Sequence, residues 1–253
     1  MFAALPQPAV VAHRGSSAHA PENTLAAFEL ARQHGADALE LDIRCTADSE
    51  LVVLHDPQLD RTTPAKGPIR NFTFPEVSAL DAGSWFHAQY SQERIPHLAQ
   101  VLDSIGSKLP LNIELKSPSL FPRDLINRTA ELLNSRVLVQ PALISSFNPF
   151  LLSRIHTLLP EFDLGLILPP GLLPWWTRTG ALNLLPLKSV HAPWPDLTEE
   201  RIQTLQSRGW KVLAYTVNDP HQLKRLCSAG IDGVITDDPI LARKIIDDQS
   251  AVE

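Results

Sequence analysis

The sequence predicts an α/β fold, namely a (β/α)8 TIM barrel built as a single domain over residues 1–253. Eight apolar, strand-like segments alternate with helical segments, and eight βα units in roughly 250 residues is the usual size of such a barrel. The alternative is a doubly wound open sheet, which more often has a glycine-rich phosphate loop after its first strand. The turn that follows the first strand here, HRGSSAHAP, is not such a loop.

The first βα unit shows the alternation clearly. Residues 8–12 form a short apolar run that breaks at a glycine turn, as a strand would. Residues 25–35 have helical apolar spacing and stop at Gly35, with Asn23 or Thr24 as the expected N-cap.

The same pattern extends to the end of the chain. The second strand is expected at 36–44, and residues 51–56 extend it across a polar turn. The remaining strands are expected at 110–116, 142–147, 162–168, 187–193, 211–218 and 232–237, and the helices after the first at 98–106, 124–137, 148–159, 172–183, 197–207, 220–229 and 239–246. Asp238 followed by Pro239 fits an N-cap with proline at the first helical position.

Residues 57–96 interrupt this alternation. Five prolines and glycines, at positions 64, 67, 68, 75 and 83, divide the segment into short pieces. About forty residues is too long for a plain connection in a compact domain, so a small subdomain inserted after the second strand is expected.

Composition excludes several classes of protein. The formal net charge is -6 and no Lys/Arg cluster interrupts it, which argues against a nucleic-acid partner. No run approaches the roughly 18 apolar residues of a membrane span, so stable membrane insertion is not expected. The N-terminus lacks a secretory signal, which predicts a cytoplasmic protein. Cys45 and Cys227 are too few for a disulfide scaffold and are expected to be separate thiols.

Charged and polar residues gather where the expected strands end, which is where barrels place their chemistry. Glu40, Asp42 and Glu114 supply three carboxylates from adjacent strands. Hard oxygen ligands of this kind suit one divalent cation, Mg²⁺ or Ca²⁺. The competing interpretation is a structural salt-bridge layer, in which Glu114 pairs with Lys116 or Arg44.

Two histidines and two cations lie beside these carboxylates. His13 ends the first strand and His55 ends the extension of the second. One histidine could take a proton from a nucleophile while the other gives a proton to a leaving alkoxide. Arg14 and Lys116 would hold the phosphoryl oxygens. Together with the metal, this set predicts metal-assisted cleavage of a phosphodiester.

At this point the motifs resemble those of the glycerophosphodiester phosphodiesterases, and most of all the cytoplasmic bacterial branch. The similar segments are VAHRG, PENT, ELDIRCTADSELVVLHD, RTT, DAGSWF, NIELK, SSF, YTVN and DGVITDDP, which run from His13 to Pro239 in the family's order. The family often has Trp in the YTVN motif, where this chain has Tyr215, so an aromatic side chain is kept.

The resemblance implies the same barrel and an insertion at residues 57–96 that shapes the glycerol pocket. It implies that His13 and His55 are the general acid and base, in an order left open. It also implies that Arg14, Lys116 and Tyr215 contact phosphate or substrate. Glu22 and Asn23 match the PENT motif and would brace the His13 loop.

The predicted reaction is hydrolysis of glycerophosphodiesters, such as glycerophosphocholine or glycerophosphoethanolamine, to sn-glycerol 3-phosphate and an alcohol, with attack by the glycerol 2-hydroxyl. One alternative is a lysophospholipase D-like activity on single-chain lipids, and another is a non-catalytic phosphodiester-binding protein. The sequence leaves open the preferred head group, Mg²⁺ against Ca²⁺ and the oligomeric state. It also leaves open whether His191 touches substrate, and whether Trp175 and Trp176 cover the entrance or pack an outer helix.

Overall fold

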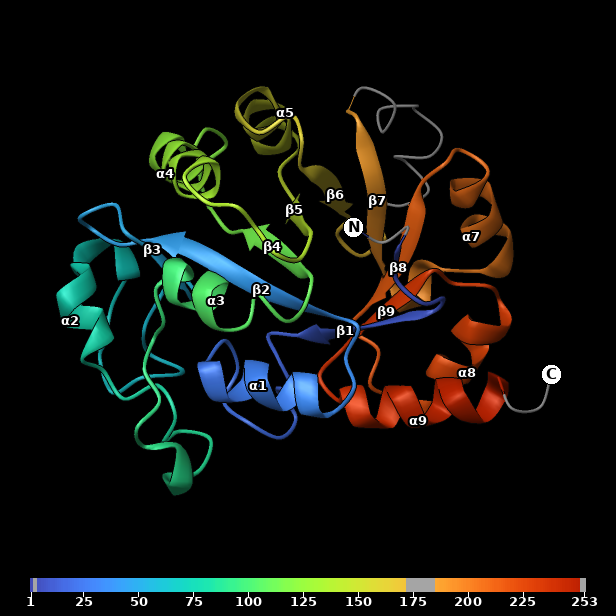
Figure 1. Cartoon of the computed structure of the whole chain (residues 1–253), viewed down its shortest axis with the longest axis horizontal. Coiled ribbons are helices and arrows are strands. Elements are labelled where there is room, and N and C mark those ends of the chain that lie inside the picture. The colour runs from blue at the N-terminus through green and yellow to red at the C-terminus, as the bar shows by residue number, and fades with distance from the viewer. Residues whose placement is uncertain (2–3, 172–184, 251–253) are drawn as a thin grey trace.

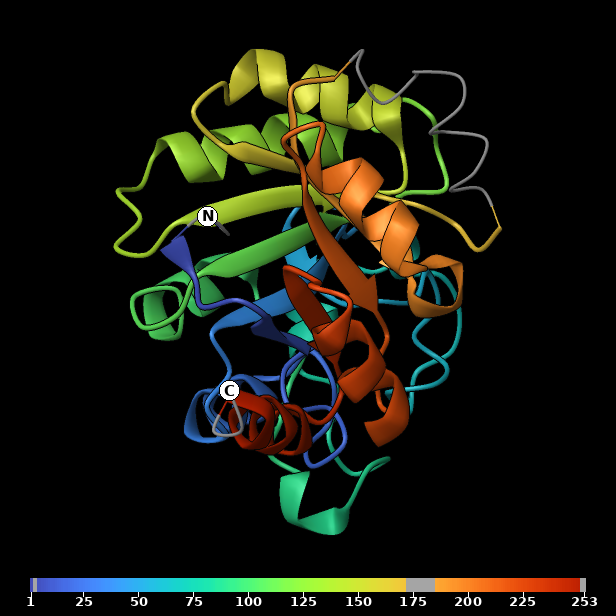
Figure 2. The same ribbon diagram turned by 90° about the vertical axis from the view of Figure 1, so that its right-hand side faces the viewer.

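The computed structural model describes residues 1, 4–171 and 185–250, and it shows a closed barrel. Figure 1 shows the strands in the centre with helices around them, and Figure 2 shows the same arrangement from the side. The strands are β1 (Ala9–His13), β2 (Ala38–Cys45), β3 (Leu51–Val53), β4 (Leu111–Leu115), β5 (Ala142–Ser146), β6 (Asp163–Ile167), β7 (Leu187–Pro193), β8 (Lys211–Tyr215) and β9 (Gly233–Thr236).

Eight of these strands pair in parallel in the order β1-β2-β4-β5-β6-β7-β8-β9, and β9 returns to β1. Strand β3 pairs antiparallel with β2 outside the ring, as the extension that the sequence predicted. The barrel and the predicted strands are therefore confirmed.

The helices follow the predicted alternation within the described residues. They are α1 (Leu25–Gln33), α2 (Phe74–Ser78), α3 (Leu98–Ser104), α4 (Arg123–Asn134), α5 (Pro149–Leu158), α7 (Glu199–Gln206), α8 (Pro220–Ser228) and α9 (Pro239–Ser250), with short 3₁₀ turns at η2 (Ile69–Asn71), η3 (Ala88–Tyr90) and η5 (Trp194–Asp196). The helix expected at 172–183 lies outside the described residues.

The caps agree with the local sequence. Of the two candidates for the α1 cap, Thr24 is the residue that accepts a hydrogen bond from the Ala27 N–H. Asp238 Oδ1 accepts a hydrogen bond from the Leu241 N–H at the start of α9.

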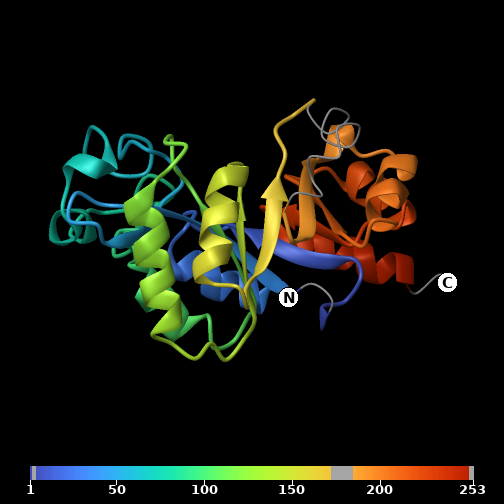
Figure 3. The same cartoon turned by 90° about the horizontal axis from the view of Figure 1, so that it is seen from above.

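Most of the buried apolar side chains lie between the strands and the surrounding helices in one cluster. A second, separate cluster lies in the segment between β3 and α3, with Leu59, Ile69 and Val77 among its members. This segment is drawn in teal and green at one side of the barrel in Figures 1 and 3. It thus has a small core of its own beside the barrel.

Two other sequence expectations can be compared directly with the structure. Cys45 and Cys227 are both free, and burial raises the pKa of the Cys45 thiol to about 12 and that of Cys227 to about 11. None of the described helices combines the length and the apolar character needed to cross a lipid bilayer.

Candidate active site

The inside of the barrel changes from apolar to polar along the strands. In one layer across the strands, Val11, Ala38, Leu143, Leu213 and Ile235 form one small hydrophobic cluster. Because strand side chains alternate with a period of two, the next inward positions on these strands carry polar groups. Those inward groups include His13, Glu40, Asp42, Ser145 and Tyr215. The carboxyl end of the barrel is therefore the polar end.

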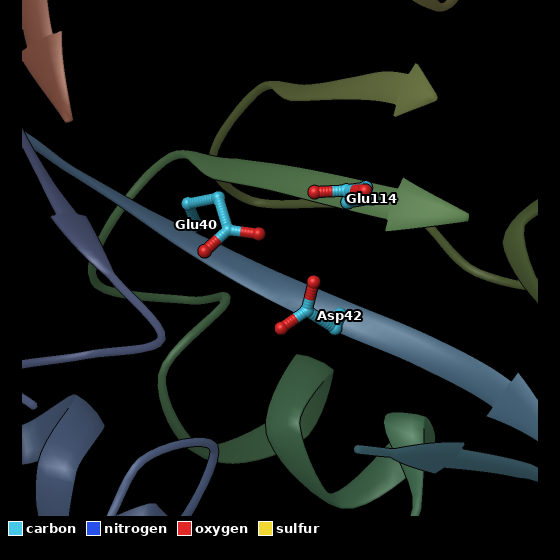
Figure 4. Close-up of side chains that lie close together, drawn as sticks. All are labelled: Glu40, Asp42 and Glu114. Atoms are coloured by element: carbon cyan, nitrogen blue, oxygen red, sulfur yellow. The ribbon is translucent and has the colours of Figure 1, made fainter. Parts of the chain in front are cut away.

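Three carboxylates meet at that end, as the sequence predicted. Glu40 and Asp42 project from β2 and Glu114 from β4, where Asp42 and Glu114 are register partners. One oxygen of each carboxylate lies within 4.8 Å of the other two. Figure 4 shows the three side chains facing one another across the two strands. All three are buried, so water screens their charges poorly.

Burial and mutual repulsion shift the pKa values of this cluster. Burial, with the charges of Asp42 and Glu114, raises the pKa of Glu40 well above its usual value. Burial also raises the pKa of Glu114, to about 7. Burial opposes ionisation of Asp42 too, but Lys116 and Arg14 outweigh it and hold the pKa of Asp42 at about 2. Concentrating three carboxylates here is thus unfavourable without further positive charge.

Ion pairs of the kind expected for a salt-bridge layer are present. Lys116 Nζ lies 2.6 Å from Glu114 Oε1 and 3.2 Å from Asp42 Oδ1. Arg14 Nε lies 3.3 Å from Asp42 Oδ2, and the Arg14 backbone N–H donates to Glu40 Oε2 at 2.9 Å. Two cations therefore face three carboxylates.

The donor set nevertheless fits a divalent cation. Asp42 Oδ1 and Glu114 Oε1 lie beside the Lys116 ammonium, whereas Glu40 Oε1 is buried without a hydrogen-bond donor among the described residues. Buried oxygens are rarely left in that state. Three convergent carboxylate oxygens are the ligands that Mg²⁺ and Ca²⁺ prefer. The two interpretations are compatible, because Lys116 lies at the edge of a cluster that can hold a cation.

His13 is oriented by a carboxylate from the far end of the chain. Its Nδ1 lies 2.6 Å from Asp237 Oδ1. Asp237 also accepts hydrogen bonds from Ser17 Oγ at 3.0 Å and from Asn218 Nδ2 at 2.6 Å. A carboxylate beside Nδ1 favours a proton on that nitrogen and leaves Nε2 to take or give a proton. Despite burial, the hydrogen bond from His13 helps to hold the pKa of Asp237 at about 2.

His55 also contacts a carboxylate through Nδ1, but this carboxylate belongs to the next residue in the sequence. Its Nδ1 lies 2.6 Å from Oδ1 of the adjacent residue, Asp56. Asp56 Oδ2 accepts a hydrogen bond from Arg61 Nε at 2.7 Å. Burial lowers the pKa of His55, and Arg61 with His55 outweighs burial to hold the pKa of Asp56 at about 2. The His55 carbonyl accepts a hydrogen bond from Arg44 Nε at 2.8 Å, which fixes its backbone.

Glu22 joins the two sides of the site. It accepts hydrogen bonds from Arg61 at 2.6 and 2.8 Å and from Arg14 NH1 at 2.9 Å. A continuous series of ion pairs therefore runs from Arg14 through Glu22, Arg61 and Asp56 to His55. The bracing role implied for Glu22 is visible in these contacts.

The loop after β1 is held in an unusual conformation. Arg14 has φ 56° and Asn23 has φ 57°, in the left-handed region that non-glycine residues rarely occupy. The Asn23 N–H donates to the Arg14 carbonyl, and Asn23 Nδ2 donates to Asp42 Oδ2 at 2.9 Å. Such backbone strain is typical of functional sites, where the surrounding contacts enforce it.

A cavity of about 190 Å³ opens above the carboxylates. It is lined by His13, Arg14, Glu40, His55, Asn112, Glu114, Lys116, Phe147, Ile167, His191, Tyr215, Thr216 and Ile235. The Tyr215 hydroxyl donates to the Leu168 carbonyl at 2.6 Å, so Tyr215 can offer its ring to a ligand. Lys116 Nζ lies 5.4 Å from the centre of the Phe147 ring, which limits the positions open to the ammonium group.

The predicted catalytic and substrate-binding residues all line this cavity, as do two of the three predicted metal ligands, Glu40 and Glu114. The third ligand, Asp42, does not line it but lies in the same carboxylate cluster. His191 forms part of the cavity floor, fully buried, with Nε2 2.9 Å from Ser189 Oγ. Burial lowers the pKa of His191 to about 3, so the ring is neutral at ordinary pH. Trp175 and Trp176 lie outside the described residues.

One expectation needs correction. Residues 57–96 were expected to shape the glycerol pocket, but among the described residues none of that segment lines this cavity. Five of its residues instead line a separate groove beside the site. From this segment, Arg61 contacts Asp56, the carboxylate that holds His55, and Glu22.

Sequence reasoning missed the partners of the two histidines. Asp56 follows His55 directly in the sequence, and this adjacency could have identified it as the partner of that imidazole. Asp237 is the last residue of the final predicted strand, and no local pattern connects it with His13. Asn112 was also missed: its amide is fully buried on the inner face of β4, with neither polar atom hydrogen-bonded among the described residues.

Comparison with known proteins identifies the family. Residues 13–241 match the Glycerophosphoryl diester phosphodiesterase family. The chain is 36% identical over 231 residues to a glycerophosphodiester phosphodiesterase of Caldanaerobacter subterraneus subsp. tengcongensis, covering 91% of this chain and 94% of that one. It is 34% identical over 251 residues to a glycerophosphodiester phosphodiesterase of Bacillus subtilis, covering 93% and 85%.

Solved structures are similar over the same length. An Oleispira antarctica phosphodiesterase in complex with the product sn-glycerol-3-phosphate superposes with a TM-score of 0.88 at 35% identity, covering 97% of this chain and 98% of that one. A glycerophosphodiester phosphodiesterase from Agrobacterium tumefaciens superposes with a TM-score of 0.80 at 28% identity, covering 94% and 99%.

Proposed function

The chain belongs to the glycerophosphoryl diester phosphodiesterase family, and on that premise we propose that it hydrolyses glycerophosphodiesters to sn-glycerol 3-phosphate and an alcohol. The observation that carries this proposal is the pair of histidines, each with Nδ1 2.6 Å from a carboxylate, beside three convergent buried carboxylates. Glycerophosphocholine and glycerophosphoethanolamine are the expected substrates. The same premise supports a cytoplasmic location and a small-molecule substrate, with no nucleic-acid partner.

Glu40, Asp42 and Glu114 would hold one divalent cation, Mg²⁺ or Ca²⁺. When bound, that ion would supply positive charge to the phosphoryl oxygens and to the attacking hydroxyl. Arg14 and Lys116 border the same cavity and would bind the phosphoryl oxygens directly, Arg14 by its planar guanidinium. The rings of Tyr215 and Phe147 would pack against the glycerol carbons.

The two histidines would carry the proton transfers. One Nε2 takes the proton of the glycerol 2-hydroxyl as that oxygen attacks phosphorus, and the other protonates the oxygen of the departing alcohol. Attack by a hydroxyl of the substrate itself is intramolecular and needs no strong external nucleophile. Water then opens the cyclic phosphate with the proton roles reversed, and the fixed charges of Arg14 and Lys116 stabilise the developing negative charge.

The test is release of glycerol 3-phosphate from glycerophosphocholine, measured before and after removal of metal with EDTA. The expected result is robust turnover that chelation abolishes and that added Mg²⁺ or Ca²⁺ restores, and the more effective ion identifies the cofactor. Full activity in chelator would exclude the metal role. No release of glycerol 3-phosphate from any glycerophosphodiester would exclude the function.

A lysophospholipase D-like activity is the second candidate. It is favoured by exposed apolar side chains next to the site, among them Phe121, which is 66% exposed, and Phe150, which is 56% exposed. Their rings contact each other at 5.9 Å between centroids. A higher kcat/KM for lysophosphatidylcholine than for glycerophosphocholine would favour this activity, and the reverse would favour the first proposal.

We also propose that residues 57–96 form an inserted subdomain. The support is the separate hydrophobic cluster that includes Leu59, Ile69 and Val77. Its functional contacts are those of Arg61 with Asp56 and Glu22, described above.

A further inference from the structure

A second cavity, of about 680 Å³, lies beside the catalytic cavity. Lys116 lines both, so the two spaces meet at a residue that also contacts the carboxylate cluster. The walls come from β2, from the loop between β4 and α4, and from the insertion around η2. Four prolines, at positions 57, 68, 118 and 122, stiffen these walls. The groove is thus a rigid-walled extension of the catalytic cavity.

The charge of this groove is opposite to that of the chain. Four cations line it, Arg44, Arg70, Lys116 and Arg123, against a single carboxylate, Asp124. The whole chain has a formal net charge of -6, so a basic groove is not a consequence of composition.

Two of these arginines lack a structural role. Arg70 and Arg123 are exposed, and among the described residues their guanidinium groups make no hydrogen bond or ion pair. Arg44 is partly buried and donates only to backbone carbonyls, those of His55 and Lys116, with no carboxylate within 4.0 Å among the described residues. By contrast, Arg14 and Arg61 are each paired with two carboxylates. Arginines left unpaired along one groove are available to a ligand.

The groove is positioned to bind the leaving alcohol of the substrate. The catalytic cavity is small and already holds the groups assigned to the glycerol phosphate. The leaving alcohol has to project away from phosphorus, opposite the attacking hydroxyl. Because Lys116 lines both cavities, an alcohol that leaves on that side enters the groove, where Arg70 and Arg123 lie.

We propose that this groove is a subsite for the leaving alcohol and that it selects glycerophosphodiesters whose alcohol carries an additional anionic group. The inference rests on the proposed function and deepens it by naming the class of head group. A phosphate on the alcohol is the chemistry that guanidinium groups bind best, by two parallel N–H···O bonds. That phosphate could be a terminal monoester or the next diester of a glycerophosphate oligomer.

The experiment compares kcat/KM for three matched substrates. The first is glycerophosphoglycerol, whose leaving glycerol is neutral. The second is the same diester with a terminal phosphate on that glycerol, and the third extends that phosphate to a further glycerol. We expect the wild-type enzyme to favour the second, the third or both by about fivefold to tenfold, because each exposed charge pair contributes modestly. The ratio of the second to the third identifies the source of the phosphate.

The double variant Arg70→Glu/Arg123→Glu should abolish that preference while changing kcat/KM for glycerophosphoglycerol by less than about twofold. Both side chains are exposed and unpaired, so the thermal unfolding temperature should stay at the wild-type value. The matched control is Lys224→Glu/Lys244→Glu, which makes the same change in net charge at exposed positions on α8 and α9 and should keep the preference. Raising NaCl from 50 to 500 mM should reduce the wild-type preference, since salt screens exposed charges.

The milder variant Arg70→Gln/Arg123→Gln serves the same purpose if charge reversal alters the fold. A wild-type enzyme that hydrolyses all three substrates equally would overturn the inference and leave the proposed function intact. A preference that persists in the arginine variants, or that disappears in the lysine control, would overturn it as well. Failure to hydrolyse any of the three would overturn the proposed function, and the subsite with it.

Discussion

The two histidines of the site have nearly the same geometry and very different supports. His13 and His55 each have Nδ1 2.6 Å from an aspartate oxygen. The partner of His13 is Asp237, at the end of the last strand, and neutral groups of the barrel bind it further. The partner of His55 is its neighbour Asp56, and a cation from the insertion, Arg61, binds it further. The same histidine–aspartate contact is therefore supported by closure of the barrel at His13 and by Arg61 of residues 57–96 at His55.

This difference teaches which parts of the chain each histidine depends on. His13 is fixed wherever the barrel is intact, because β1 and β9 are register partners from Ala9 to Ala12. His55 lies beyond β3, where Arg44 holds its carbonyl, and the carboxylate that orients its ring, Asp56, is bound in turn by Arg61. Residues 57–96 therefore contribute to the surroundings of His55 and not to those of His13.

The largest effect should come from removing either imidazole. His13→Ala and His55→Ala should each lower kcat about 10²- to 10⁴-fold, because each removes one of the two proton transfers. Stopped assays of glycerol 3-phosphate release, with circular dichroism as a check of folding, measure this. His221→Ala, at an exposed position on α8, is the matched control and should retain wild-type turnover. A variant at 13 or 55 with wild-type turnover would rule out the two-histidine scheme.

Substitution of the two aspartates should distinguish the support of His13 from the support of His55. Asp237→Asn and Asp56→Asn should each lower kcat about 10- to 100-fold, since the imidazole loses the charge that orients it. Only Asp237→Asn should also lower stability, by about 1 kcal/mol, because Ser17 and Asn218 lose a charged acceptor within the barrel. Measurements of kcat together with urea unfolding would show whether both variants lose activity while only Asp237→Asn loses stability. Equal losses of stability in the two variants would contradict the division between barrel and insertion.

Removing the cation of the insertion should have a smaller effect, confined to the His55 side. Arg61→Met should lower kcat about fivefold to tenfold and leave the unfolding temperature nearly unchanged, because 43% of the Arg61 side chain is exposed and exposed ion pairs add little stability. The double variant Arg61→Met/Asp56→Asn should lose little more than Asp56→Asn alone, as expected of residues acting through one contact. Lys66→Met, an exposed cation of the same segment, is the control. Additive losses in the double variant would show that Arg61 acts elsewhere.

The smallest effect on turnover is expected for His191, which takes no part in the proposed proton transfers. Burial lowers the pKa of His191 to about 3, against about 6.5 in an unfolded chain. The unfolded chain therefore binds the proton more readily, so stability should fall as pH drops below 6.5 and continue to fall toward pH 3. His191→Gln should remove about 2 kcal/mol of the loss between pH 7.5 and pH 5, measured by urea unfolding.

The control for this measurement is His221→Gln, which is exposed and should keep the wild-type dependence on pH. An unchanged acid sensitivity in His191→Gln would show that the buried imidazole is not the group responsible.

The parts of the site that were predictable are those encoded by local periodicity. The alternation along β2 places Glu40 and Asp42 on one face, and the apolar run of β4 isolates Glu114 and Lys116 at its end. These patterns need no knowledge of distant contacts, so the three carboxylates and both histidines could be named from the sequence.

The remaining features depend on contacts between distant segments. The pairing of Asp237 with His13 spans 224 residues and exists only because the barrel closes. The approach of Arg61 to Glu22 depends on how the insertion folds, and its short, proline-broken pieces carry no periodic signal. For the same reason the groove beside Lys116 could not be foreseen, since three separate elements form its walls.

The pairing of β9 with both β1 and β8 has a consequence for synthesis of the protein. A nascent chain that has not yet added β9 has an open sheet with two unpaired edges, and its first histidine lacks the carboxylate that orients it. Unpaired edges invite association with other strands. Closure of the ring and the orientation of His13 therefore arrive in the same step, when residues 233–237 pair with the strands on either side.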